Sequence, residues 1–266
     1  MSWIRRVVGW CRDIQRRYSA IGGQTLAAGV TLYGFLALFA LLVLSVAVLG
    51  FLSINNVDLA TEISGDLGLT GDAGKIVTDA VNAAQKSRQL TTVVGVVGII
   101  WLGSSWALSI ANAYNASWHV PGRGLADRGR GLVWLFGYLA ILGASGVATA
   151  GWDLLPTWFA PLVILTSLAA NTALWLWTSW WLPNRPVAWR VILGPAILGA
   201  FALEALKVLG AYVVPQYVAR SSELYGTIGV VFAILLWLLI FGRIVVYLGV
   251  IEVRRADHLA PAAAAG

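Results

Sequence analysis

Six long apolar stretches constrain what this chain can fold into. Each has about 20 residues or more, the length that an α-helix needs to cross the hydrocarbon core of a bilayer. They cover residues 27–52, 92–112, 131–151, 160–182, 191–214 and 227–250, each to within a few residues. The composition agrees, because 59% of the residues are hydrophobic and only 11% are charged, against about 25% charged in soluble domains. The sequence therefore predicts an all-α membrane protein with six transmembrane helices.

The basic residues predict the orientation of these spans. Arginines concentrate in the N-terminal arm, in the loops after spans two and four, and in the C-terminal tail. The opposite side carries only Lys75, Lys86, Arg88 and Arg220. Because positively charged residues stay on the cytoplasmic side of a membrane, we expect both termini to be cytoplasmic.

The spans divide the chain into three parts. We expect residues 1–26 to form a cytoplasmic amphipathic arm, residues 27–250 the six-helix transmembrane domain, and residues 251–266 a cytoplasmic tail. In the arm, apolar side chains from Ile4 to Tyr18 recur on one helical face and arginines on another, which predicts a helix on the membrane surface. A plain basic tail is an equal alternative. The long outer loop, residues 53–91, has helical spacing of apolar residues between 73 and 84, which predicts a short helix there.

Motifs for catalysis or metal binding are missing from the sequence. It contains no HExxH, P-loop, dinucleotide-binding or GxSxG pattern, and Cys11 is its single cysteine. We therefore expect no enzymatic activity, no catalytic residues, no cofactor and no metal site. The net charge is +6, and the basic residues cluster beside apolar segments. We therefore expect anionic membrane lipids as partners, and no nucleic acid.

Charged and polar residues inside the spans are the main functional candidates. Glu204 and Lys207 lie near mid-depth in span five, Asn171 in span four and Arg243 in span six. A charge at the membrane centre costs at least about 2.5–3.5 kcal/mol, so these groups must pair or face water. One interpretation is a Glu204–Lys207 pair, three residues apart on one helix face, that fixes span five against span six. The other is a polar cavity lined by all four residues that handles a charged or amphipathic solute.

Several short motifs occur in an order that resembles the YihY/BrkB family of bacterial inner-membrane proteins, over about residues 20–255. The Glu204 to Lys207 element, Tyr225-Gly226, and Leu248-Gly249 with Glu252 resemble the family's last two spans. The stretches SIANAYNASWHVPGRG and WWLPNRPVAWR resemble two of its loops, through Asn115, Trp118, Pro121, Pro183 and Arg185. Arg243 departs from the family pattern, which is mostly apolar at that position.

The resemblance implies a multi-pass protein of the bacterial inner membrane that is linked to envelope integrity. One branch of the family is connected with export of a lipopolysaccharide precursor. We therefore expect a protein that transports or flips an anionic lipid or a lipid-linked envelope precursor, and a homo-oligomer is left open. The alternative is a non-transporting membrane scaffold in which the intramembrane charges are purely structural. The name ribonuclease BN, which some family members carry, has no support in these residues.

Overall fold

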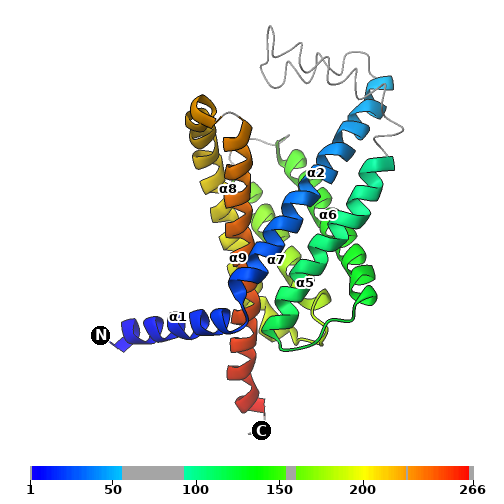
Figure 1. The fold of residues 1–266 in the computed structure, drawn as a ribbon. Helices are drawn as coiled ribbons and strands as arrows, with labels where there is room; N and C mark the ends of the chain where they lie inside the picture. The colour runs from blue at the N-terminus through cyan, green and yellow to red at the C-terminus, as the bar shows by residue number, and fades with distance from the viewer. Residues whose placement is uncertain (1, 56–92, 154–159, 226, 264–266) are drawn as a thin grey trace. The chain divides into compact units, whose positions relative to one another are not determined.

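The fold is helical throughout the part of the chain that the computed structural model describes, residues 2–55, 93–153, 160–225 and 227–263. This part holds seven long α-helices and one π-helical turn, and no strand (Figure 1). The all-α prediction is therefore confirmed. The bounds are α1 Ser2–Ala20, α2 Gly23–Asn55, the π-helical turn Ile99–Gly103, α5 Ser104–Ser117, α6 Leu125–Asp153, α7 Ala160–Trp181, α8 Trp189–Tyr225 and α9 Thr227–Ala263.

Within the described residues, six helical stretches are long and apolar enough to cross a membrane, as the sequence predicts. They are Gly23–Leu41, Val93–Ser117, Leu125–Ala148, Leu162–Trp181, Trp189–Gly210 and Val231–Leu259. The last two helices, α8 and α9, have 37 residues each, so they continue well beyond the predicted ends of their spans. Helix α9 includes residues up to Ala263 that the sequence assigns to a tail. The short helix predicted between residues 73 and 84 lies outside the described residues.

The chain divides into two compact units, residues 1–33 with 104–266, and residues 34–103. In the second unit, α2 packs closely on the helical stretch that begins at residue 93. A Cβ atom on Gly95 would lie 3.1 Å from the backbone of Leu44, and one on Gly98 would lie 3.2 Å from the Cβ of Ala40. Glycine at these two positions therefore allows the two backbones to approach each other, as small residues do in membrane proteins.

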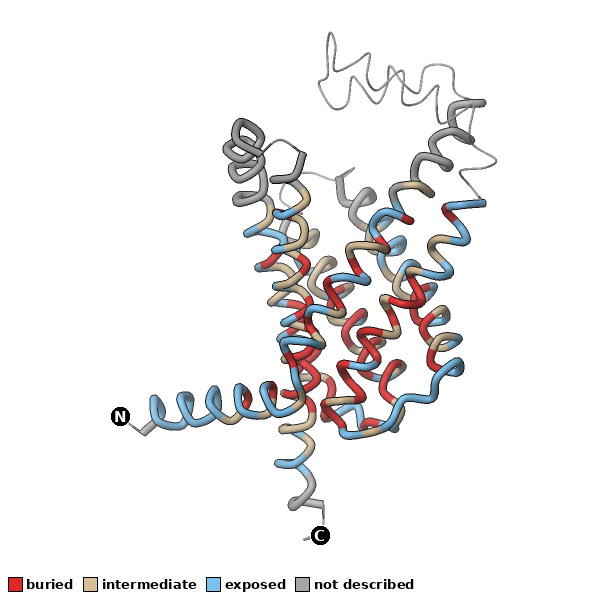
Figure 2. The backbone as a smooth tube through the Cα atoms, viewed as in Figure 1, coloured by how far each residue is buried: buried red, intermediate tan, exposed pale blue. Residues whose placement is uncertain are grey.

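In the first unit, helices α5 to α9 form a closed ring. Each helix contacts the next one in sequence, and α5 also contacts α9. Buried residues gather at the end of the ring where the α5–α6 and α7–α8 loops lie (Figure 2). Trp134 and Trp175 are among the largest fully buried side chains, and the Trp134 indole donates a 3.0 Å hydrogen bond to Thr178 Oγ1. This end of the ring is therefore its tightly packed part.

Helix α1 lies across the C-terminal half of α9 (Figure 1). Tyr18 is buried and stacks on Tyr247 with ring centroids 4.3 Å apart, and the Tyr247 hydroxyl donates a 2.7 Å hydrogen bond to Gln15. The chain then turns into α2 at Gly22, whose φ of 66° suits glycine. Toward the N-terminus, α1 leaves Trp3 and Val7 exposed, as expected of an arm whose apolar side chains meet a membrane surface.

Candidate functional site

The loop residues that the family resemblance singles out meet at the packed end of the ring. Oδ1 of the buried Asn115, on α5, accepts a 2.8 Å hydrogen bond from the backbone N–H of Asn184. The Asn184 side chain donates to the backbone carbonyl of Pro121 at 3.2 Å and to Asp127 Oδ2 at 3.0 Å. Asp127 is buried and also accepts a 2.6 Å hydrogen bond from the backbone N–H of Arg123. The α5–α6 and α7–α8 loops are thus bonded to each other.

Two arginines complete this loop network. The Arg185 guanidinium lies 4.3 Å from the centre of the Trp118 ring, a cation–π distance. Arg130 donates to the backbone carbonyls of Trp181 and Pro183, and Pro183 is almost fully buried. Trp118, Pro183 and Arg185 therefore belong to one structural cluster, although the sequence places them in two separate loops.

Glu252 is the family position with the most unexpected environment. The sequence assigns it to the tail, but it lies within α9 with an exposed fraction of 0%. Its Oε1 accepts a hydrogen bond from Ser179 of α7, whose hydroxyl lies 3.4 Å from that of Tyr114 on α5. The Trp118 indole interacts with the same carboxyl, although neither the indole N–H nor Glu252 Oε2 has a partner with full hydrogen-bond geometry. In the described part of the chain, Glu252 forms no ion pair.

Gly249 explains how α9 comes close enough for Glu252 to reach α7. A Cβ atom at this position would lie 2.9 Å from Ser117 Oγ, so a larger residue would push α9 away from α5. Gly249 precedes Glu252 by three residues and shares its helix face. The family's Leu-Gly and Glu elements therefore act together, the glycine providing space and the carboxyl providing the buried polar contact.

The second polar site lies within the membrane-spanning stretches of α7 and α8. Glu204 Oε1 accepts hydrogen bonds from Ser167 at 2.6 Å, Asn171 at 2.5 Å and Lys207 at 3.1 Å. Lys207 Nζ also donates to Ser167 at 3.0 Å. The structure thus brings together three of the four predicted candidates, Asn171, Glu204 and Lys207. It adds Ser167, which lies one turn before Asn171 on the same helix face.

The fourth candidate, Arg243, lies elsewhere. It is exposed on α9, and its charge acts on Tyr18 of α1. It is absent from the hydrogen-bond partners of Glu204. The Glu204 cluster, defined as Ser167, Asn171, Glu204 and Lys207, therefore joins α7 to α8 and does not use α9.

The Glu204 cluster is only partly covered by protein. The side chain of Glu204 is 25% exposed and that of Lys207 is 46% exposed. Glu204 lies 15 residues after the start of α8 at Trp189, which is about 22 Å along the helix axis and thus well inside a hydrocarbon core about 30 Å thick. A carboxylate and an ammonium group thus reach the surface of the ring at membrane depth.

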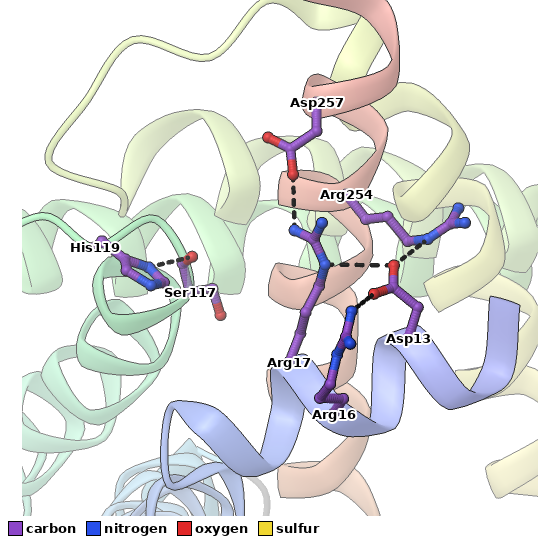
Figure 3. Close-up of polar contacts among 7 residues, drawn as sticks. All are labelled: Asp13, Arg16, Arg17, Ser117, His119, Arg254 and Asp257. Carbon is purple, nitrogen blue, oxygen red and sulfur yellow. Dashed lines mark hydrogen bonds and ion pairs between the residues drawn. The ribbon is translucent and has the colours of Figure 1, made fainter. Parts of the chain in front are cut away.

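A third group of charges connects α1 to the end of α9 (Figure 3). Asp13 accepts from Arg254 at 2.9 Å and pairs with Arg16 at 3.1 Å and Arg17 at 3.4 Å, while Arg17 pairs with Asp257 at 2.7 Å. The hydrogen bond from Arg254 holds the pKa of Asp13 below its ordinary value. Arg17 also borders a cavity of about 150 Å³ beside Ser117 and His119. These pairs fix α1 on α9.

Metal binding has no candidate in the described ranges, where no three His, Cys, Asp or Glu side chains gather. Of the remaining family positions, Tyr225 is the last residue of α8. The Tyr225 side chain and Gly226 lie outside the described residues.

A ring of long apolar helices, with a buried polar seam at one end and a charged pair at membrane depth, defines a polytopic helical membrane protein. Comparison with known proteins gives its family. The family described as virulence factor BrkB matches residues 14–262, so the chain belongs to that family.

Two curated relatives are similar over most of their length. An uncharacterized protein of Dickeya dadantii (strain 3937) is 23% identical, covering 87% of this chain and 78% of the relative. Inner membrane protein YhjD of Escherichia coli (strain K12) is 22% identical, covering 89% of this chain and 77% of the relative. No solved structure matches the chain. Together with the six apolar helices, the family places the protein in the inner membrane as a multi-pass protein.

Proposed function

We propose that this protein transports or flips an anionic lipid or a lipid-linked envelope precursor across the inner membrane, and so supports envelope integrity. The observation that carries the proposal is the partly exposed Glu204–Lys207 pair at membrane depth. The proposal assigns no catalytic step, cofactor or nucleic-acid partner to the protein.

The proposal is supported by a difference between Glu204 and Lys207 in hydrogen bonding and exposure. Glu204 Oε1 has three donors, so the carboxylate is well compensated for leaving water. Lys207 makes two hydrogen bonds although an ammonium group has three donors, and nearly half of its side chain is exposed. A lysine held in this way at membrane depth can meet the phosphate of a passing lipid while Glu204 keeps it in place.

The alternative function is that of a non-transporting scaffold. It is favoured by the position of the Glu204 cluster, in which three of the four hydrogen bonds run between α7 and α8 and the fourth lies within α8. Under this alternative the cluster fixes the register of two helices, and the pair contacts no lipid headgroup. The two functions differ in whether the purified protein moves lipid.

The orientation with both termini in the cytoplasm is part of the proposal. Arg123, Arg185 and Arg254 belong to the same unit, at the end of the ring that α1 contacts. A concentration of arginines on one side of a membrane protein favours the cytoplasm for that side.

A lipid-translocation assay tests the proposed function. Purified protein is reconstituted into liposomes that contain fluorescent phosphatidylglycerol or fluorescent phosphatidylcholine, and dithionite bleaches the label in the outer leaflet. The expected result is that bleaching proceeds past the outer-leaflet fraction with phosphatidylglycerol, and faster than with phosphatidylcholine. Bleaching that stops at the level of protein-free liposomes for both lipids would reject transport in favour of the scaffold.

A further inference from the structure

A groove of about 410 Å³ lies where α1, α8 and α9 meet, away from the Glu204 cluster. Its apolar side is formed by Pro195 and Leu198 of α8, and by Ile251 and Leu259 of α9. Its polar side is formed by Arg254, Arg255 and His258 of α9, with Trp10 of α1 at its edge. None of the residues that line the groove is acidic.

The nearby carboxylates neutralise the groove only in part. The Asp13 carboxylate pairs with the Nε atom of Arg254. The Asp257 carboxylate pairs with Arg17, which lies outside the groove. In the described part of the chain, Arg255 forms no ion pair and is exposed. The groove therefore keeps the guanidinium of Arg255 and the outer nitrogens of Arg254 for an anion.

Gly194 shapes the groove for Arg255. A Cβ atom on Gly194 would coincide with the guanidinium group of Arg255, so the arginine head lies directly against the backbone of α8. Any larger residue at position 194 would force the guanidinium away. The glycine thus positions a cation that has no carboxylate partner among the described residues.

The apolar part of the groove indicates what kind of anion fits. Leu198 is 46% exposed, and Leu198 and Ile251 lie on the membrane side of the arginines, within the spans Trp189–Gly210 and Val231–Leu259. Trp10 lies 5.8 Å from the Arg254 guanidinium, and tryptophan favours the membrane–water interface. An apolar wall beside guanidinium groups at this level suits an amphipathic ligand whose phosphate meets the arginines.

We propose that this groove binds the headgroup phosphate of an anionic phospholipid, with Arg255 and Arg254 as donors and Leu198 and Ile251 against the glycerol and upper acyl chains. His258 adds a third polar contact. The site serves a resident lipid at the membrane interface, so the inference holds whether the protein transports lipid or acts as a scaffold.

A titration of the full-length, delipidated protein in neutral detergent tests the site. Dihexanoyl phosphatidylglycerol, dihexanoyl phosphatidylcholine and inorganic phosphate are added separately, and the thermal unfolding temperature gives an apparent affinity through the stabilisation that ligand binding causes. We expect saturable stabilisation by phosphatidylglycerol alone. Equal stabilisation by phosphatidylcholine would contradict selection of an anionic headgroup by the arginines. Equal stabilisation by inorganic phosphate would show that the groove binds anions without recognising a lipid.

Variants identify the groove. Arg255→Gln is expected to weaken phosphatidylglycerol binding by about tenfold or more, since a hydrogen bond to a charged group contributes about 1.5–3 kcal/mol. Gly194→Ala keeps every charge but displaces the guanidinium, and it should weaken binding similarly. Arg190→Gln, an exposed arginine of α8 outside the groove, is the matched control and should change binding less than about twofold. Unchanged affinity in Arg255→Gln would contradict the proposal even if Gly194→Ala fails to fold.

The outcome is separable from that of the proposed function. Thr172→Val lies on α7, outside the groove, and is expected to leave the phosphatidylglycerol titration unchanged. If the wild-type protein binds phosphatidylglycerol in the groove but translocates none, the lipid-binding site stands and the proposed transport function is rejected.

Discussion

The backbone N–H of Asn184 donates a 2.8 Å hydrogen bond to Oδ1 of Asn115, although 69 positions separate the two residues. This bond joins the C-terminal end of α5 to the loop after α7. Asn115→Ala removes the acceptor and leaves a partly buried N–H without a partner, which costs about 1–3 kcal/mol. We expect a lower thermal unfolding temperature in detergent. Asn112→Ala, on the exposed side of α5, is the control, and an equal loss in both variants would contradict the role of Asn115.

Glu252 offers a prediction about a buried carboxyl without an ion pair. Glu252→Gln keeps the shape and an acceptor for Ser179 and removes any cost of burying a charge, so we expect the unfolding temperature to stay the same or rise. Glu252→Ala leaves a cavity and removes the carboxyl acceptor of the Ser179 hydroxyl, and should cost about 2 kcal/mol or more. Thermal unfolding of the purified variants separates the two. A Gln variant as unstable as the Ala variant would show that the ionised carboxylate itself is required.

Asp13 predicts how the docking of α1 depends on pH. Its pKa is lowered in the folded protein, first by the hydrogen bond from Arg254. The ionised Asp13 carboxylate therefore stabilises the folded protein fully at a pH above the ordinary pKa of 3.8. This stabilisation is lost as the pH falls through the lower pKa that Asp13 has in the folded protein. Spin labels on Cys11 and on Leu125→Cys, both exposed, report the position of α1 in the same unit. We expect one narrow distance distribution at pH 7 and a broad one well below pH 4.

Two variants control this measurement. Asp13→Asn should broaden the distance distribution already at pH 7, because it removes the charge that pairs with Arg254 and Arg17. Arg16→Gln should leave it narrow, because the Arg16 side chain is 81% exposed and exposed pairs contribute little. A narrow distribution in Asp13→Asn at pH 7 would mean that apolar contacts such as the Tyr18–Tyr247 stack hold α1 without the ion pairs.

The single cysteine gives a direct test of orientation. Cys11 is exposed on α1, so a membrane-impermeant maleimide reaches it only from its own side of the membrane. We expect labelling in inverted inner-membrane vesicles and none in intact spheroplasts, since the arginine distribution favours a cytoplasmic N-terminus. Cys11→Ala is the control for background labelling. Labelling of the spheroplasts would reverse the assigned orientation.

The spans could be predicted because their signal is local. A run of about 20 apolar residues has one stable state in a bilayer, since a helix satisfies every backbone hydrogen bond within the segment. The i, i+3 spacing of Glu204 and Lys207 also predicts their pairing. The depth of Asn171 in span four predicts that it lies near them. Ser167 could have been found in the same way, because it lies four residues before Asn171 on α7.

Other features depend on contacts between distant segments, which the spacing of residues does not contain. Glu252 follows the last apolar run and precedes two arginines, so its sequence context is that of a tail, yet helix α9 continues and α5 and α7 enclose it. Arg243 was grouped with Glu204 because of its depth, but the rotation of α9 directs it away. Which face of a long helix meets its neighbours is decided by packing, here by glycines such as Gly249.

We propose that Lys207 and Glu204 act on a lipid during transport. The most direct measurement is phosphatidylglycerol translocation in liposomes by Glu204→Gln, Lys207→Met and the double variant, beside unfolding temperatures for each. Thr172→Val on α7, whose hydroxyl bonds only its own helix, is the control and should keep wild-type translocation. We predict that both single variants fold and lose translocation by about tenfold or more, and that the double variant does not recover it. Full translocation in folded single variants, or unstable single variants rescued by the double, would contradict the claim and identify the pair as structural.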